Sequence, residues 1–156
     1  MVIVADTSPI NYLVLIEQIG ILPRLYGRVL IPPAVYDELT HPAAPSPVRD
    51  WTERHPRWLE VVSPKNTVAL AQLDLGESQA IALASESGEG VVLIDELAGR
   101  QEARRRGLKV AGTLSVLDDA DRAGLVRYEE VVARLRKTSF RVSQAVLAEI
   151  DQRRSR

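Results

Sequence analysis

Short apolar runs that end in an acidic residue, separated by helix-like segments, constrain this chain more than any other feature. Val2–Ala5 is followed by Asp6, and Val91–Ile94 is followed by Asp95. A carboxylate at the end of a buried strand points into the crevice where α/β folds place their chemistry. The two runs therefore predict two strands of one sheet, each with an acidic group at its carboxyl end.

Strand-like and helix-like segments alternate along the chain, with short Gly-marked turns between them. Strands are expected at 2–5, 29–31, 59–62, 91–94 and 109–111. Helices are expected at about 9–19, 21–26, from Pro33 to beyond Leu39, 48–54, 76–87, 97–106 and 113–123, with two more after Tyr128. This alternation predicts an α/β fold, a three-layer α/β/α sandwich with a central parallel sheet.

The length and ends of the chain bound its organisation. A chain of 156 residues fits one domain. We expect a core domain over residues 1–125 and a helical extension over 126–156 packed on it. No run approaches the roughly 20 apolar residues of a membrane span, and the N-terminus lacks a signal-peptide pattern. The expected location is therefore cytoplasmic.

The composition removes several kinds of chemistry. The chain has no cysteine, which excludes disulfides, zinc–thiolate sites and thiol catalysis. Its two histidines, His41 and His55, have no serine or cysteine partner in an obvious motif, which argues against a nucleophile–histidine mechanism. The net charge of -1 gives no overall support to nucleic-acid binding, although Arg and Lys cluster at 100–109 and along the C-terminal stretch.

Two further acids are expected at the same edge of the sheet. Glu38 lies in the helix after Pro33, on the flank of its buried stripe, and Glu77 opens the helix at 76–87. Carboxylates gathered in one crevice repel one another unless a cation lies between them. Mg²⁺ and Mn²⁺ prefer such oxygen ligands. The four acids Asp6, Glu38, Glu77 and Asp95 therefore predict a metal-dependent active site.

Asp6 and Glu77 also have structural explanations, and Glu38 alone would be an ordinary glutamate on a helix surface. Asp6 could cap the first helix, with Thr7 or Ser8 as other cap candidates, and an acid at Glu77 suits the helix dipole. Asp37, Asp74 and Glu96 compete with their neighbours for the ligand roles. Ser8 and Asn11 are candidates to orient a metal-bound water, and Thr113 is expected to reach the same rim. Arg100 and Lys109 are candidate phosphate contacts, with ordinary surface charge as the alternative.

The order of these motifs resembles the PIN-domain ribonucleases, and most closely the branch of VapC-type toxins of toxin–antitoxin pairs. The resemblance rests on Ala5-Asp6-Thr7-Ser8, Pro32-x-x-Val35-x-x-Glu38-Leu39, Gly76-Glu77-Ser78, Leu93-Ile94-Asp95-Glu96 and Gly112-Thr113-Leu114, and it runs from Val2 to about Leu125. Many members carry Asp at the third acidic position, where this chain has Glu77.

The resemblance implies Mg²⁺- or Mn²⁺-dependent cleavage of RNA, a cognate antitoxin protein and a homodimer. It assigns the metal and catalytic roles to the same four acids, with Thr113 as the polar residue after the last core strand. The leading hypothesis is thus an endoribonuclease that acts as a toxin. The alternative is a catalytically weak or inactive PIN-fold module that binds RNA or protein. A phosphotransferase with Asp6 as nucleophile is disfavoured, since Ser8 stands where such enzymes carry a second Asp.

Overall fold

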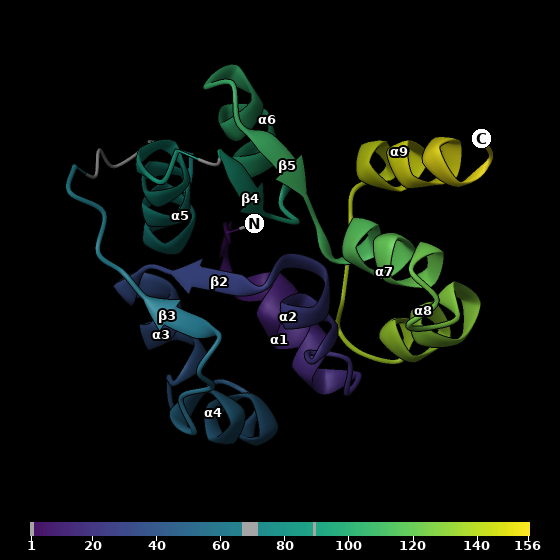
Figure 1. Cartoon of the computed structure of the whole chain (residues 1–156), viewed down its shortest axis with the longest axis horizontal. Helices are drawn as coiled ribbons and strands as arrows, with labels where there is room; N and C mark the ends of the chain where they lie inside the picture. Colours follow the sequence, from purple (N-terminus) through teal and green to yellow (C-terminus); the bar gives the residue numbers. More distant parts are fainter. Residues whose placement is uncertain (1, 67–71, 89) are drawn as a thin grey trace.

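A central parallel sheet organises the molecule. The computed structural model describes residues 2–66, 72–88 and 90–156. Within them five parallel strands lie in the order β3-β2-β1-β4-β5 (Figure 1). They are β1 (Val2–Ala5), β2 (Arg28–Ile31), β3 (Leu59–Val61), β4 (Val91–Leu93) and β5 (Lys109–Ala111). The chain builds outward from β1 to β3 and then returns to β4, so the strand order reverses between β1 and β4.

Helices flank this sheet, which confirms the predicted α/β sandwich. They are α1 (Thr7–Leu15), α2 (Ile21–Tyr26), α3 (Pro33–Leu39), α4 (Ser46–Glu53), α5 (Leu75–Glu86), α6 (Leu97–Arg105), α7 (Thr113–Arg122), α8 (Tyr128–Arg136) and α9 (Gln144–Arg154). Across the described residues, no helix has the length and apolar character needed to span a membrane.

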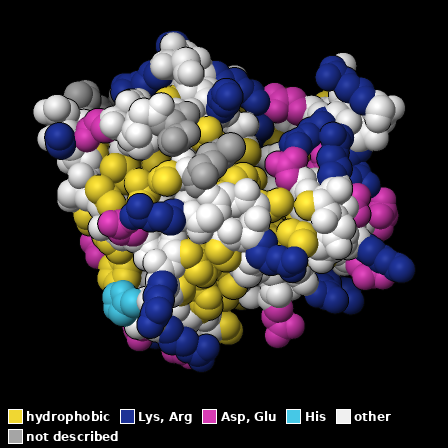
Figure 2. Space-filling view, in the orientation of Figure 1, with side chains coloured by type: hydrophobic (Ala, Val, Ile, Leu, Met, Phe, Trp, Pro, Cys, Tyr) yellow, Lys and Arg dark blue, Asp and Glu magenta, His cyan; other side chains and the backbone are white. Residues whose placement is uncertain are grey.

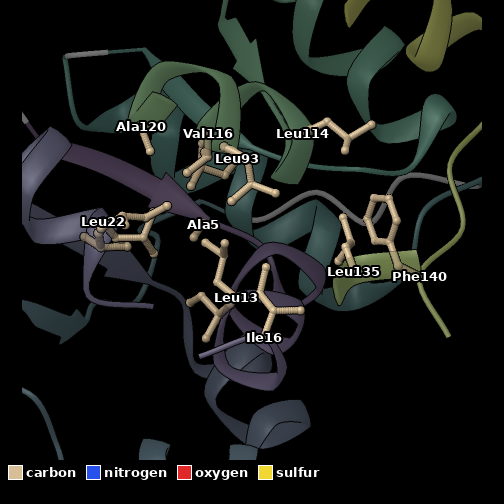
Figure 3. Close-up of a cluster of buried hydrophobic side chains, with 14 of the residues drawn as sticks. Ala5, Leu13, Ile16, Leu22, Leu93, Leu114, Val116, Ala120, Leu135 and Phe140 are labelled. Carbon is tan, nitrogen blue, oxygen red and sulfur yellow. The ribbon is translucent and has the colours of Figure 1, made fainter. Parts of the chain in front are cut away.

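The strands are apolar on both faces because helices cover both sides of the sheet. Ile3 and Ala5 of β1 belong to the larger core, which includes side chains from α1, α2, α7 and α8 (Figure 3). Val4 points the opposite way, into a smaller core formed with α5 and α6. The alternation along β1 follows the two-residue period of a strand.

The first helix differs from its predicted bounds. It begins at Thr7, so Thr7 and Ser8 lie in its first turn and neither is the N-cap; Asp6 holds that position and makes no capping hydrogen bond through its side chain. The helix ends at Leu15, well before Gly20, since Glu17 adopts a left-handed backbone conformation with φ of 60°. Both hydroxyls of the first turn are thereby free to bond elsewhere.

The C-terminal helices pack on the rest of the fold. Helices α8 and α9 both lie against α7 (Figure 1). Val131 and Leu135 of α8 and Ile150 of α9 are buried in the larger core. The apolar face of this segment is therefore part of the larger core. A division of the chain near residue 125 stays a prediction.

Candidate active site at the carboxyl edge of the sheet

The two strand-end aspartates lie where the strand order reverses. Asp6 follows β1, and Asp95 lies two residues beyond β4, the strand paired with β1. The backbone amide of Asp6 donates to the carbonyl of Leu93 at 3.0 Å, which extends the pairing to the edge. In open α/β sheets this reversal opens a crevice beyond the carboxyl ends of the strands. Both aspartates are buried, so each carboxylate is largely removed from bulk water.

Glu38 and Glu77 reach the same edge from two helices. Thr7 Oγ1 donates to Glu38 Oε2 at 2.7 Å, which ties the end of α3 to the first turn of α1. A Cβ atom on Gly76 would lie 2.5 Å from Glu38 Oε1 and 3.4 Å from Asp6 Oδ1, so both carboxylates approach the backbone at the start of α5. Glu77 is the next residue and is buried. Because Gly76 has no side chain, the carboxylates of Glu38 and Asp6 can approach the start of α5.

Burial, with the charges of neighbouring acids adding to it, raises the pKa values of Asp6, Glu38 and Glu77. Burial raises the pKa of Asp6 well above its usual value; the Thr7 backbone amide opposes this, and the negative charges of Asp74, Glu77 and Glu38 add to the rise. Burial, followed by the charge of Asp74, raises the pKa of Glu77 to about 7. Burial also raises the pKa of Glu38, against the hydrogen bond from Thr7. Such a set of carboxylates is an unfavourable arrangement without a cation.

Asp74 is the acid that sequence reasoning left as a competitor, and the structure brings it into the cluster. It is the N-cap of α5, and its carboxylate accepts from the backbone amide of Glu77 at 2.8 Å. Its charge contributes to the raised pKa values of Asp6, Glu38 and Glu77. The signal was present in the sequence, because an aspartate three residues before the first-turn amide is a typical N-cap.

Asp95 lies in a different environment on the other side of the crevice. Its Oδ1 accepts from the Thr113 backbone amide, and its Oδ2 accepts from Thr113 Oγ1 and from Ser8 Oγ, all at 2.7 Å. A Cβ atom on Gly112 would lie 2.7 Å from Asp95 Oδ1, so the backbone passes close by. Asp95 therefore joins the first turns of α1 and α7 through three hydrogen bonds.

A model of the family described as PIN domain matches residues 2–156. The chain belongs to the PIN-domain family. Among solved structures, it is similar to a PilT N-terminus domain protein from the hyperthermophilic archaeon Sulfolobus solfataricus, with a TM-score of 0.57 and 16% sequence identity over 77% of this chain and 93% of that one. At this identity the likeness supports the fold alone. No curated protein matches the chain.

PIN domains are typically metal-dependent nucleases, and the donor atoms of this PIN domain suit a hard divalent cation. Asp6, Glu38, Asp74 and Glu77 offer oxygens only, and the Oε2 atom of Glu77 is buried without a hydrogen-bond partner in the described structure. The described parts of the chain nevertheless contain no three acidic or histidine side chains already placed to hold a metal ion. The chemistry of the site fits the ion, whereas a shared coordination sphere needs side-chain movement.

The other predicted site residues divide into near and distant ones. Asn11 is half-buried, one turn after Ser8 on α1, and Glu96 is exposed beside Asp95 and adds to the raised pKa of Glu77. Lys109 begins β5 and pairs with Val91, so it lies at the opposite end of the sheet from Asp95. Four residues of strand separate those ends by roughly 13 Å. A role for Lys109 in the acidic crevice is therefore not supported.

Arg100 is also unavailable to a phosphate in solution. Its guanidinium is buried, donates to the Ile94 carbonyl at 2.9 Å and pairs with Glu149 of α9 at 3.1 Å. The sequence suggested a surface cation because Arg100 belongs to an Arg-rich run, but it faces inward while Arg104, Arg105 and Arg106 remain exposed. Arg100 instead connects the end of β4 to α9.

Proposed function

We propose that this PIN domain is an endoribonuclease that hydrolyses RNA phosphodiester bonds with Mg²⁺ or Mn²⁺. The observation that supports the proposal is the acidic cluster where the strand order reverses: Asp6, Glu38 and Glu77 come from three separate elements and have raised pKa values. A fold gains nothing in stability from this clustering, so the repulsion argues for a bound cation.

The four acids have unequal parts in this proposal. Asp6, Glu38 and Glu77 would hold one or two divalent ions, with Asp74 as an added source of negative charge. A carboxylate offers about four lone-pair sites. Three at Asp95 already accept hydrogen bonds, which leaves about one for a metal ion or its water. Asp95 would therefore be a ligand of fixed orientation, whereas the other three can move.

The remaining side chains prepare the site. A bound divalent ion supplies an activated water and stabilises negative charge on the scissile phosphate. Thr7 orients Glu38, and Ser8 and Thr113 orient Asp95, through the hydrogen bonds given above. Asn11 lies on the same face of α1 as Ser8 and would orient water at the crevice. Burial of Asp6 and Glu77 limits competing bulk water around the reacting groups.

The proposal is tested by incubating the purified protein with single-stranded RNA, and with DNA of the same sequence, in Mg²⁺, Mn²⁺ or EDTA. We expect cleavage of RNA that requires the metal and is lost in Asp6→Asn. Asp50→Asn is the matched control, since Asp50 is an exposed aspartate on α4 outside the acidic cluster. Cleavage by Asp6→Asn at the wild-type rate would refute the site, and cleavage of DNA alone would refute the substrate.

A second candidate function is a PIN-fold module that binds RNA without cutting it. It is favoured by the finding that no three acids of the described residues are already placed around a metal position. The same experiment separates the two functions, because a binding module retains RNA on the protein in every buffer and yields no products. Metal-dependent products would exclude it.

The likeness of the motifs to VapC-type toxins supports a biological role for the nuclease. We propose a cytoplasmic toxin that forms a homodimer and is inhibited by a cognate antitoxin protein. Expression of the chain in its host should arrest growth, and Asp6→Asn should not. Co-expression of a small DNA-binding protein encoded next to it should restore growth. Growth arrest by Asp6→Asn would count against this role.

A further inference from the structure

The segment that joins α8 to α9 returns to the acidic edge of the sheet. Phe140 packs edge-on against Tyr12 of α1, with 5.1 Å between ring centroids, and the Tyr12 hydroxyl lies 2.9 Å from Ser139 Oγ. Arg141, Val142 and Ser143 follow and lead into α9. These contacts place the 138–143 segment beside α1, the helix whose first turn carries Thr7 and Ser8 (Figure 1).

Ion pairs hold α9, and with it the end of this segment. Glu149 pairs with Arg100 at 3.1 Å and with Arg104 at 3.0 Å. At the C-terminal end of α9, Arg154 pairs with buried Asp118 at 2.6 Å and lies 3.6 Å above the ring centroid of Tyr128. Basic and acidic side chains consequently alternate over the α7–α9 surface (Figure 2). The arginines of α9 are thus occupied by protein carboxylates.

Arg141 is placed differently from those arginines. It lines a pocket of about 210 Å³ together with Val142 and Ser143 on one side and Asp95, Glu96 and Leu97 on the other. Its side chain is exposed, and one amino group donates to the Phe140 carbonyl at 2.7 Å. Within the described residues it forms no ion pair, although the two acids line the same pocket. The pocket has the volume of about seven water molecules.

We propose that Arg141 binds a backbone phosphate of the RNA strand, next to the phosphodiester that is cut at the acidic cluster. The inference rests on the proposed nuclease function. An acidic crevice repels a polyanion, so the strand needs a cationic contact close to the cutting site. A guanidinium presents paired donors that match phosphate oxygens. Arg141 lines a pocket with Asp95, whereas Arg100 is buried and Lys109 lies at the opposite end of the sheet.

The test measures RNA affinity apart from cleavage. In the Asp6→Asn background, binding of a fluorescent single-stranded RNA is measured by anisotropy in Mg²⁺ for the parent, Arg141→Ala, Arg141→Lys and Arg134→Ala. Arg134 is the matched control, because it is an exposed arginine on α8 that does not line the pocket. We expect Arg141→Ala to raise Kd about tenfold, the effect of one lost charged hydrogen-bonding contact. Arg141→Lys should recover part of that loss.

A salt series adds a readout that a structural role would not change. Loss of one phosphate contact should reduce the slope of log affinity against log salt by about 0.7 for a single strand. Unaltered melting of Arg141→Ala, together with a raised Kd, would support direct contact. If Arg141→Ala and Arg134→Ala had equal RNA affinities and equal salt slopes, the role of Arg141 would be refuted. Metal-dependent RNA cleavage by the wild type would still support the nuclease function in that case. Absence of both cleavage by wild type and RNA binding would overturn both.

Discussion

Both flanks of the crevice carry buried carboxylates, but one flank surrounds them with other acids and the other with hydrogen-bond donors. On one flank, Asp6 and Glu77 are buried beside other acids, and their pKa values are raised. On the other, Asp95 is equally buried but accepts three hydrogen bonds from Ser8 and Thr113. Burial alone therefore does not decide what a carboxylate does for the fold. Hydrogen bonds from Ser8 and Thr113 let Asp95 connect two helices, whereas Asp6 and Glu77 lie among other acids and have raised pKa values.

The largest effect should come from removing charge on the acid-rich flank. We expect Asp6→Asn to lower RNA cleavage by roughly a thousandfold, because the proposed ion loses a ligand and the scissile phosphate loses charge stabilisation. Initial rates in Mn²⁺ would measure it, with Asp50→Asn retaining the wild-type rate. A fall in the cleavage rate of less than tenfold would mean that Asp6 is not a metal ligand. The acid-rich flank would then have no special role in catalysis.

The next prediction separates the flanks by stability. Asp95→Ala should lower the free energy of unfolding by about 2–4 kcal/mol, since the buried Thr113 amide and two hydroxyls lose their acceptor. Asp6→Ala in EDTA should change it little or raise it by about 1 kcal/mol, because repulsion with its neighbours is relieved. Urea unfolding of both variants gives the values. Equal destabilisation would show that both aspartates serve the fold in the same way.

Sequence patterns were sufficient for the fold because each local signal agreed with its neighbours. The apolar runs at 2–5 and 91–94, which end in aspartates, predicted strands, and the structure places them side by side at the reversal of strand order. The bounds of α1 were wrong, since a left-handed Glu17 is a choice of backbone conformation that composition does not reveal. The rule that parallel strands share a carboxyl edge predicted the positions of Asp6 and Asp95, whereas Glu38 and Glu77 reach that edge from helices. The metal and catalytic roles of the four acids stay predictions.

What the sequence could not provide was the partner of each charged group. Ser8 and Thr113 could be placed near the edge, but their shared bonds to Asp95 depend on how α1 and α7 meet in three dimensions. Arg100 belongs to a run of similar residues, and only packing shows which of them faces Ile94 and Glu149. Arg141 lies far from every motif along the chain, so its place beside Asp95 and Glu96 has no local signature.

The raised pKa of Glu77 gives a prediction of pH dependence on the acid-rich flank. Its value of about 7 in the fold exceeds the ordinary 4.5. Between these values the folded protein binds the proton and the unfolded chain does not, so stability falls as pH rises from about 4.5 to 7 and stays reduced above that. In EDTA, we expect Glu77→Gln to remove up to about 3 kcal/mol of this loss.

Urea unfolding of wild type and Glu77→Gln at pH 5 and pH 8.5 provides the measurement. The variant should gain stability relative to wild type at the higher pH, and Mn²⁺ should remove most of that advantage by stabilising the wild-type carboxylate. Glu53→Gln is the control, because Glu53 is an exposed glutamate at the end of α4, away from the acidic cluster. A stability difference independent of pH would contradict the assignment of the raised pKa to Glu77.

The smallest effect tests the space around Glu38 on the acid-rich flank and needs no change in charge. Gly76→Ala would bring a methyl group within 2.5 Å of Glu38 Oε1, the end of a side chain that can turn away. We expect cleavage to fall about tenfold as Glu38 leaves the cluster, while the free energy of unfolding changes by less than about 1 kcal/mol, since alanine also favours the helix. Gly20→Ala is the control, because nothing lies within 4 Å of its added Cβ. An unchanged rate would show that Glu38 acts from another position, and the acid-rich flank would then consist of Asp6, Asp74 and Glu77.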